Sequence, residues 1–338
     1  MDSKIDFVIT WVDGNDKKWL AEKEKYLENN IEFDISNCRY RDWDMLKYWF
    51  RSIERYAPWV HKIYFVTAGH YPNWLNLHHP KVQLIRHSDI LPKQVLPTFN
   101  SNAIEMGIEN IPGLSEQFVY FNDDMFISDY VEQKDFFHNN LPCDSAILST
   151  IIPRESNGFY KALSNTVYVL NEKFNIHFCM KNNWKKWYTL KYGKNMLRNI
   201  IFSKSNGFPG FYNSHIPNSY LKSIYSEAIH YDTKMFENTI NSRFRNNDKN
   251  FIHWIAQYWQ FAMGKFYPRK LNFGKYFSIS DSLEEVCQSI LKQKYKLICI
   301  NDTCDDNEFE KCKNAVINAF EQKFPNKSSF EKGLDNDE

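Results

Sequence analysis

Short runs of apolar, β-branched and aromatic residues recur along the first 125 residues, and polar turns separate them. Such a continuous apolar run is typical of a strand that is buried on both faces. The first run ends in the polar turn Asp13-Gly14-Asn15-Asp16. The runs predict strands at Ile5–Val12, Lys62–Thr67, Val82–Arg86 and Gln117–Phe121.

Between these runs, apolar residues recur at the spacing of a helix. Met45, Trp49, Ile53 and Tyr56 lie three or four positions apart and predict a helix over Trp43–Tyr56, which Pro58 would end. A second helix is predicted over Asn100–Asn110, before the turn Pro112-Gly113. Strands that alternate with helices predict an α/β fold with a mostly parallel, doubly wound sheet.

The pattern changes after residue 150. Residues 150–210 are rich in Asn, Lys and aromatic residues and show weak periodicity, so we interpret 151–212 as a helical insertion that shapes the acceptor side. Residues 216–265 read as mainly helical, and a strand at Leu297–Ile300 precedes a helix at Phe309–Phe324. The predicted units are a nucleotide-sugar-binding α/β core at 1–150, the insertion at 151–212, a helical region with a strand and helix that complete the site at 213–332, and a frayed tail at 333–338.

Composition narrows the class of protein. Lys and Arg number 42 against 41 Asp and Glu, and this balance argues against nucleic acid as a partner. The seven Cys form no C-x-x-C pair, so we expect reduced thiols in a cytoplasmic protein. No stretch approaches the roughly 18 apolar residues of a membrane span. We therefore expect a soluble protein, or one held peripherally at a membrane surface.

Two acidic turns follow predicted strands. Asp123 and Asp124 come directly after Gln117–Phe121, and Asp13 follows the first strand. Because ligands bind beyond the carboxyl ends of parallel strands, we expect both turns to face one crevice. An Asp pair there can hold Mg²⁺ beside a diphosphate or act as a general base. A solvated turn or a helix cap is the alternative interpretation.

The other candidate site residues, each taken alone, could have either a functional or a structural role. Glu105 lies in a predicted helix, and Arg39 with Asp42 opens another, where an Arg beside a helix N-terminus can bind an anion. His215 can act as acid or base near neutral pH, and Arg245 can clamp phosphoryl oxygens. Spacing alone leaves each of them open to a structural role.

Four blocks, in order along the chain, together resemble the Stealth family. The first is I-D-F-V-I-T-W-V-D-G-N-D, and the second runs from Arg39 to Asp124 with R-Y-R-D-W-D-M-L-K-Y and F-V-Y-F-N-D-D-M-F. The third is looser and joins His215-Ile216-Pro217 to Phe244-Arg245 and Asp248. The fourth is C-I-N-D-T-C-D-D followed by A-F-E-Q-K-F-P-N-K-S-S-F-E. The short gap between Arg245 and Asp248 departs from the family pattern and leaves the role of Asp248 in doubt.

The resemblance implies a compact bacterial capsule or cell-wall polysaccharide phosphotransferase. Such an enzyme is similar to the catalytic core of the animal N-acetylglucosamine-1-phosphotransferase. It implies a nucleotide-sugar transferase fold of Rossmann or GT-A-like type, with a UDP-sugar site and Mg²⁺ or Mn²⁺ as cofactor. The implied roles are catalytic for Asp123, Asp124, Glu105, His215 and Arg245, nucleotide-sugar-binding for Trp11, Val12, Asp13, Arg39 and Asp42, and metal-binding for Glu105, Asp124, Asn301 and Asp302.

The expected reaction moves a hexose-1-phosphate from a UDP-sugar to a hydroxyl of a polysaccharide or lipid-linked glycan. UMP leaves and a phosphodiester linkage forms, near the inner face of the cell membrane. Asp123, Asp124 or His215 would be the base. One alternative is a metal-dependent glycosyltransferase that releases UDP, and a second is a non-catalytic glycan-binding protein, which the 17% aromatic content would suit.

Overall fold

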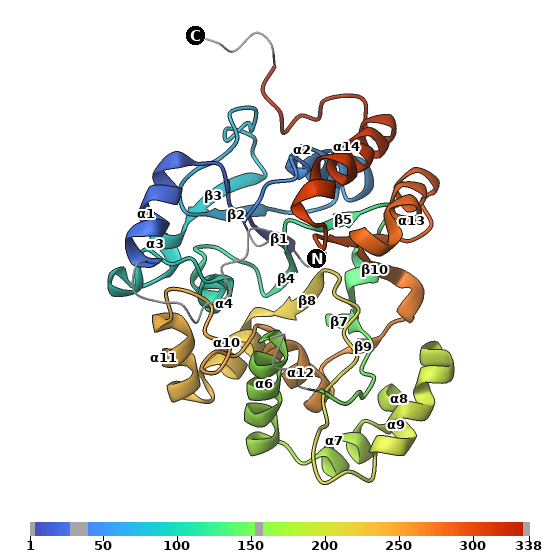
Figure 1. Cartoon of the computed structure of the whole chain (residues 1–338). Helices are drawn as coiled ribbons and strands as arrows, with labels where there is room; N and C mark the ends of the chain where they lie inside the picture. The colour runs from blue at the N-terminus through green and yellow to red at the C-terminus, as the bar shows by residue number, and fades with distance from the viewer. Residues whose placement is uncertain (1–3, 28–39, 153–157, 334–338) are drawn as a thin grey trace.

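The largest sheet of the protein has five strands in the order β3-β2-β1-β4-β8 (Figure 1). The structure is a computed structural model and describes residues 4–27, 40–152 and 158–333. β1 to β4 are parallel to one another, and β8 is antiparallel to β4. The strands are β1 (Ile5–Thr10), β2 (Ile63–Thr67), β3 (Val82–Arg86), β4 (Gln117–Phe121) and β8 (Asn218–Leu221). The predicted α/β class with a mostly parallel sheet is confirmed.

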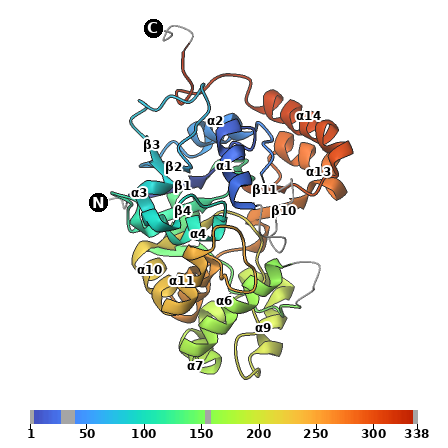
Figure 2. The same ribbon diagram turned by 60° about the vertical axis from the view of Figure 1, so that its left-hand side comes forward.

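Helices cover both faces of this sheet, and alternate strand residues enter two separate cores. Phe7 and Ile9 of β1 pack in the core that contains α2 (Leu46–Tyr56), whereas Val8 packs in the core that contains α12 (Trp254–Ala262). All residues of β2 and β4 are buried. This two-sided cover explains why the strands read as continuous apolar runs. Figure 2 shows α2 on one side of the sheet and α10 (Lys222–His230) on the other.

The other helices pack around this framework, and α1 contributes Trp19 to a third, small core with Phe99 and Phe244. The remaining α-helices of the described residues are α1 (Lys17–Leu27), α3 (His87–Ile90), α4 (Ser101–Met106), α5 (Gln133–Phe136), α6 (Phe159–Lys173), α7 (Ile176–Asn182), α8 (Trp184–Trp187), α9 (Met196–Phe202), α11 (Thr233–Asn241), α13 (Ile279–Lys292) and α14 (Asp306–Lys323). Short 3-10 helices are η2 (Lys93–Val95), η3 (Ile108–Asn110), η4 (Leu190–Asn195) and η5 (Leu271–Phe273). None of the helices in the described part of the chain is long and apolar enough to span a bilayer.

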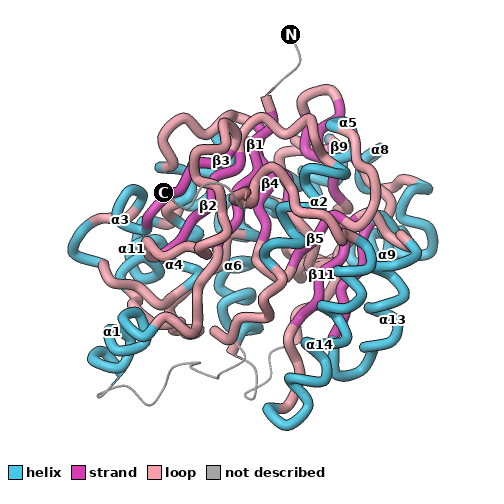
Figure 3. Tube along the Cα trace, turned by 90° about the horizontal axis from the view of Figure 1, so that it is seen from above, coloured by secondary structure: helices cyan, strands magenta, loops and turns pink. Residues whose placement is uncertain are grey.

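A second sheet connects the C-terminal part of the chain to the end of β4. Its strand order is β10-β11-β5, with β10 parallel and β5 antiparallel to β11. Figure 3 shows β5 and β11 beside α13 and α14. A third, small sheet has the order β6-β7-β9. The bounds are β5 (Met125–Ile127), β10 (Gly274–Ser278), β11 (Leu297–Asn301), β6 (Phe137–His138), β7 (Leu141–Asp144) and β9 (Tyr267–Pro268).

Most predicted elements occur with shifted ends. Val82–Arg86 and Gln117–Phe121 match β3 and β4, whereas Trp11 and Val12 lie beyond the end of β1. The helix predicted over Asn100–Asn110 is α4 followed by η3, and Asn100 caps it by accepting the Asn102 N–H.

Two later regions were only partly described by the sequence pattern. Residues 158–204 are helical, as expected of the predicted helical insertion, but three of their four α-helices, α7 to α9, are too short to produce a clear periodicity. The region expected to be mainly helical also contains β8. This strand was not predicted, because it pairs with β4, which lies about a hundred residues earlier in the sequence. The predicted tail lies outside the described residues apart from Gly333.

Candidate active site

A cavity of about 290 Å³ opens at the carboxyl ends of β1 and β4. Side chains that follow both strands line it, as expected where the carboxyl ends of parallel strands meet at one edge. Ten of the twelve predicted site residues line this cavity: Trp11, Val12, Asp42, Glu105, Asp123, Asp124, His215, Arg245, Asn301 and Asp302. The fold therefore brings together side chains from all four sequence blocks.

The paired carboxylates lie at the end of β4. The deep position of Asp123 among protein atoms, together with the carboxylates of Asp124 and Asp42, raises its pKa to about 7. Water in the cavity reaches Asp123, which is an exposed side chain, and this contact moderates the effect of its deep position. Burial also raises the pKa of Asp124, while the neighbouring His215 and a hydrogen bond from the Cys299 thiol, at 3.3 Å, oppose the shift.

Glu105 enters the cavity from α4 and is almost fully buried. The Tyr120 hydroxyl donates to Oε1 at 3.4 Å, and the Tyr225 hydroxyl donates to the Glu105 carbonyl at 2.8 Å. Burial raises the pKa of Glu105 to about 7, while the positive charge of Arg245 opposes the shift. This carboxyl is held in place and is easily protonated.

His215 and Arg245 face these acidic groups from the third block. His215 has a left-handed backbone (φ 46°), which is uncommon for a non-glycine residue, and its N–H donates to Asn213 Oδ1 at 2.6 Å. Its ring packs edge-on against Trp254, with 5.7 Å between ring centroids. Arg245 donates from Nη2 to Ser101 Oγ at 2.7 Å. The positive charge of the Arg245 guanidinium opposes the rise in the pKa of both Glu105 and Asp123, so this cation acts on both carboxyl groups.

Two acidic oxygens of the cavity suit a divalent cation. Asp124 Oδ1 and Glu105 Oε2 are buried and accept no hydrogen bond from any described residue. Buried acceptors without a donor are costly, and carboxylate oxygens are the ligands that Mg²⁺ prefers. Ligand atoms of Asp124, His215 and Cys299 lie within 4.8 Å of one another. Burial raises the pKa of Cys299 well above its ordinary value, so its thiol suits hard Mg²⁺ poorly.

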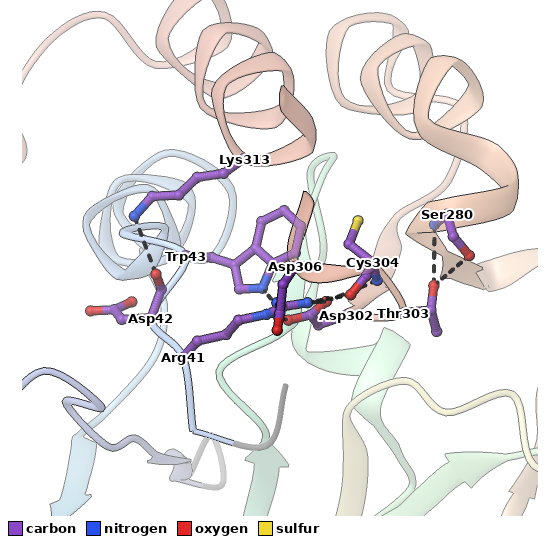
Figure 4. Close-up of polar contacts among 9 residues, drawn as sticks. All are labelled: Arg41, Asp42, Trp43, Ser280, Asp302, Thr303, Cys304, Asp306 and Lys313. Carbon is purple, nitrogen blue, oxygen red and sulfur yellow. Dashed lines mark hydrogen bonds and ion pairs between the residues drawn. The ribbon is translucent and has the colours of Figure 1, made fainter. Parts of the chain in front are cut away.

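Asp302, also predicted as a metal ligand, is held by Arg41 (Figure 4). Arg41 Nη2 donates to Oδ1 at 2.7 Å, and Arg41 Nε donates to Oδ2. The Trp43 indole also donates to Oδ2, at 3.0 Å, and the Cys304 N–H donates to Oδ1 at 3.1 Å. Four donors engage this carboxylate, so its geometry favours a structural link between the second and fourth blocks.

The predicted nucleotide residues are divided. Trp11, Val12 and Asp42 line the cavity, but Asp13 does not, and Arg39 lies outside the described residues. The Asp13 N–H donates to His70 Nε2 at 3.0 Å. Burial raises the pKa of Asp42 to about 6, and nearby Asp44 and Asp13 add to the shift. Asp13 therefore acts on the site through its charge near Asp42.

Sequence reasoning missed several residues that line the cavity. Arg41 stands between two candidates in the R-Y-R-D motif, so its neighbours were a usable signal. The half-buried His87 and the buried His253 gave no signal at all. Burial lowers the pKa of His87 to about 4 and that of His253 to about 3, so both are neutral. The other missed residues include Tyr40, Trp43, Ser101, Phe159, Asn247 and Trp254.

Comparison with known proteins shows which family this chain belongs to. Family models of Stealth conserved regions 1, 2 and 4 match residues 3–31, 39–144 and 288–337. Capsular polysaccharide phosphotransferase WcwK of Streptococcus pneumoniae is 48% identical over 97% of this chain and 98% of its own length. Exopolysaccharide phosphotransferase cps2G of Lactiplantibacillus plantarum is 39% identical over 97% of this chain and 96% of its own. Receptor polysaccharide phosphotransferase WefC of Streptococcus oralis is 37% identical, over 97% and 99%. The chain belongs to the Stealth family and is a phosphotransferase.

Proposed function

We propose that the protein transfers a hexose-1-phosphate from a UDP-sugar to a hydroxyl of a polysaccharide or lipid-linked glycan. The observation that carries this proposal is the meeting of three carboxyl groups with His215 and Arg245 on one cavity. The names of the relatives, which are capsular, exopolysaccharide and receptor polysaccharide phosphotransferases, support the acceptor class.

In the proposed reaction, the acceptor oxygen attacks the phosphorus that carries the sugar. The bond from that phosphorus to the bridging oxygen breaks, and UMP leaves with the bridging oxygen. The hydroxyl proton passes to a base. Asp123 is suited to this role because cavity water reaches it and its pKa is raised to about 7, and Asp124 and His215 are the alternatives.

The cationic side chain of the site has a separate task. Arg245 presents a guanidinium that can hold phosphoryl oxygens in line with the attacking oxygen. Its bond to Ser101 Oγ and its charge next to Glu105 and Asp123 orient it toward the cavity. Catalysis would rest mainly on positioning and on charge stabilisation.

A divalent ion fits this reaction. Mg²⁺ or Mn²⁺ would offset the negative charge of the diphosphate, and Asp124 and Glu105 are the residues best placed to hold it. Asn301 also lines the cavity and could contribute its amide oxygen. The engagement of Asp302 by Arg41 disfavours it as a ligand.

Nucleotide product analysis tests the proposal. The purified protein is incubated with Mg²⁺ or Mn²⁺, a panel of UDP-sugars and a glycan acceptor. We expect UMP together with a phosphodiester-linked sugar. Release of UDP with a glycosidic product would establish the glycosyltransferase alternative instead.

Use of a UDP-sugar donor also favours action in the cytoplasm, close to the inner membrane face where such glycans are assembled.

A further inference from the structure

Residues 176–204, here called the α7–α9 segment, concentrate exposed apolar side chains. Large exposed Leu, Ile, Phe or Trp side chains occur in the described residues at seven positions, and Ile152 is the one outside this segment. Leu190 is 88% exposed and Ile201 is 69% exposed. The six in the segment are Phe178, Trp184, Leu190, Leu197, Ile200 and Ile201. Clustered exposure of this kind marks an interaction surface.

The α7–α9 segment is firmly anchored to the rest of the fold. Trp187 is buried in the core that contains α12, and Tyr192 of η4 is also buried. Asn199 is fully buried, and its side-chain amide donates to the carbonyls of Ala146 and Trp187 at 2.8 Å each. Its Oδ1 accepts the Leu148 N–H at 2.7 Å. A loose attachment therefore does not explain the exposure of the apolar side chains.

The exposed residues lie on the outer side of these helices. Leu197, Ile200 and Ile201 are spaced by three and four positions in α9, which places them on one helix face, while Asn199 points into the core. In α8, Trp184 is exposed and Trp187 is buried. Figures 1 and 2 show α7 and α9 at the end of the molecule opposite α14.

The charge of the α7–α9 segment differs from that of the whole chain. It contains seven Lys and Arg and no Asp or Glu, whereas the chain carries a net charge of +1, so the rest carries −6. Four of these cations are exposed: Lys181, Lys185, Lys194 and Lys204. The segment is thus both strongly basic and apolar on its outer surface.

We propose that the α7–α9 segment is a membrane-binding surface for a bilayer that contains anionic phospholipids. Exposed Trp, Phe, Leu and Ile would enter the boundary between headgroups and acyl chains, and the lysines would bind lipid phosphates. A protein partner would explain the apolar side chains, but the absence of any acidic residue among seven cations favours an anionic surface. The inference does not depend on the identity of the donor or the acceptor.

Vesicle co-sedimentation of the full chain tests this surface. We expect binding to phosphatidylglycerol-containing vesicles, weaker binding to pure phosphatidylcholine, and loss of binding as salt screens the charges. The double substitution Leu197→Ser with Ile201→Ser should weaken binding by about tenfold or more, because each removes a large apolar side chain from the bilayer. Lys181→Glu with Lys185→Glu should weaken binding to the anionic vesicles alone.

A matched control uses exposed residues elsewhere. Tyr130→Ser with Lys311→Glu removes one exposed aromatic residue and one exposed cation outside the α7–α9 segment and should leave binding unchanged. The proposal would be overturned if the wild-type protein bound neither kind of vesicle. It would also be overturned if the double variant Leu197→Ser with Ile201→Ser bound as tightly as the wild type. Self-association through this surface without vesicle binding would assign it to a second copy instead. Turnover of a soluble acceptor by these variants is measured separately. A variant that loses vesicle binding but keeps turnover shows that the membrane proposal and the proposed reaction can be tested independently.

Discussion

Arg41 and Asp302 are 261 residues apart in the sequence and form a bidentate ion pair beside the candidate active site. Their side chains are 14% and 10% exposed, so the pair is largely shielded from water. Arg41 also donates to the Cys304 carbonyl at 2.5 Å and to Asp306 Oδ1 at 2.8 Å. The pair ties the loop before α2 to the end of β11 and so fixes one wall of the cavity.

Arg41→Ala should destabilise the protein strongly. Removing one partner leaves the largely shielded Asp302 carboxylate without its cation, and losses of this kind cost about 3 kcal/mol when the pair is buried. Urea unfolding would measure the free energy of unfolding. Lys134→Ala is the matched control, because Lys134 forms an exposed ion pair with Glu132 and its loss should change stability little. Equal stability of the two variants would contradict a structural role for Arg41.

Asp123→Asn should remove most turnover and leave the fold intact. Loss of a general base typically lowers kcat by about 10²- to 10⁴-fold. Steady-state kinetics with the UDP-sugar donor would measure this, with circular dichroism to check the fold. Asp248→Asn is the control, since Asp248 is exposed, lies outside the cavity lining and pairs with Lys161 at 2.8 Å. If both variants keep normal turnover, Asp123 is not the base.

Arg245→Lys should lower kcat while the protein stays folded. Lysine keeps the positive charge but cannot reproduce the planar guanidinium that holds two oxygens at once. Turnover close to that of the wild type would show that charge alone is needed at this position. Arg198→Lys provides the comparison, because Arg198 also donates to a serine hydroxyl, that of Ser149, but lies outside the cavity lining.

Mg²⁺ should raise the thermal stability of the protein through Asp124. A ligand at ten times its Kd stabilises a folded protein by about 1.4 kcal/mol. Asp124→Asn should abolish this gain, which differential scanning fluorimetry would detect. Asp302→Asn should lower the starting stability but keep the gain, because Arg41 and Trp43 already engage that carboxylate. If the Asp302→Asn variant lost the stabilisation by Mg²⁺, Asp302 would be a metal ligand after all.

Glu105 should make the metal-free protein less stable as pH rises. Its pKa is about 7 in the folded state and about 4.5 when unfolded, so above pH 4.5 the unfolded chain releases a proton that the folded protein still holds. The contribution of Glu105 to stability is therefore greatest below pH 4.5 and falls until about pH 7. Glu105→Gln stays neutral and should exceed the wild type by up to roughly 3 kcal/mol at pH 8, and by little at pH 4. Chemical unfolding in EDTA at both pH values would measure the difference.

The sequence alone determined four strands of the main sheet and the chemistry at its edge. Apolar runs marked β1 to β4 because parallel strands buried on both faces need consecutive apolar residues. The family blocks pointed to the acidic, His and Arg side chains that line the cavity. Local periodicity also marked α2 and α14, although only α14 buries a single face and most of α2 is buried.

Only the tertiary structure decided which of these residues meet and what holds them. β8 was missed because its partner, β4, lies far away in the sequence, and pairing leaves no local signal. The same reason hid the link from Arg41 to Asp302 and the two neutral histidines at the cavity, since burial depends on contacts between distant segments. The exposed face of α9 became visible only when Asn199 was seen to be buried on the other side, because a short helix shows no preferred face until its partners are known.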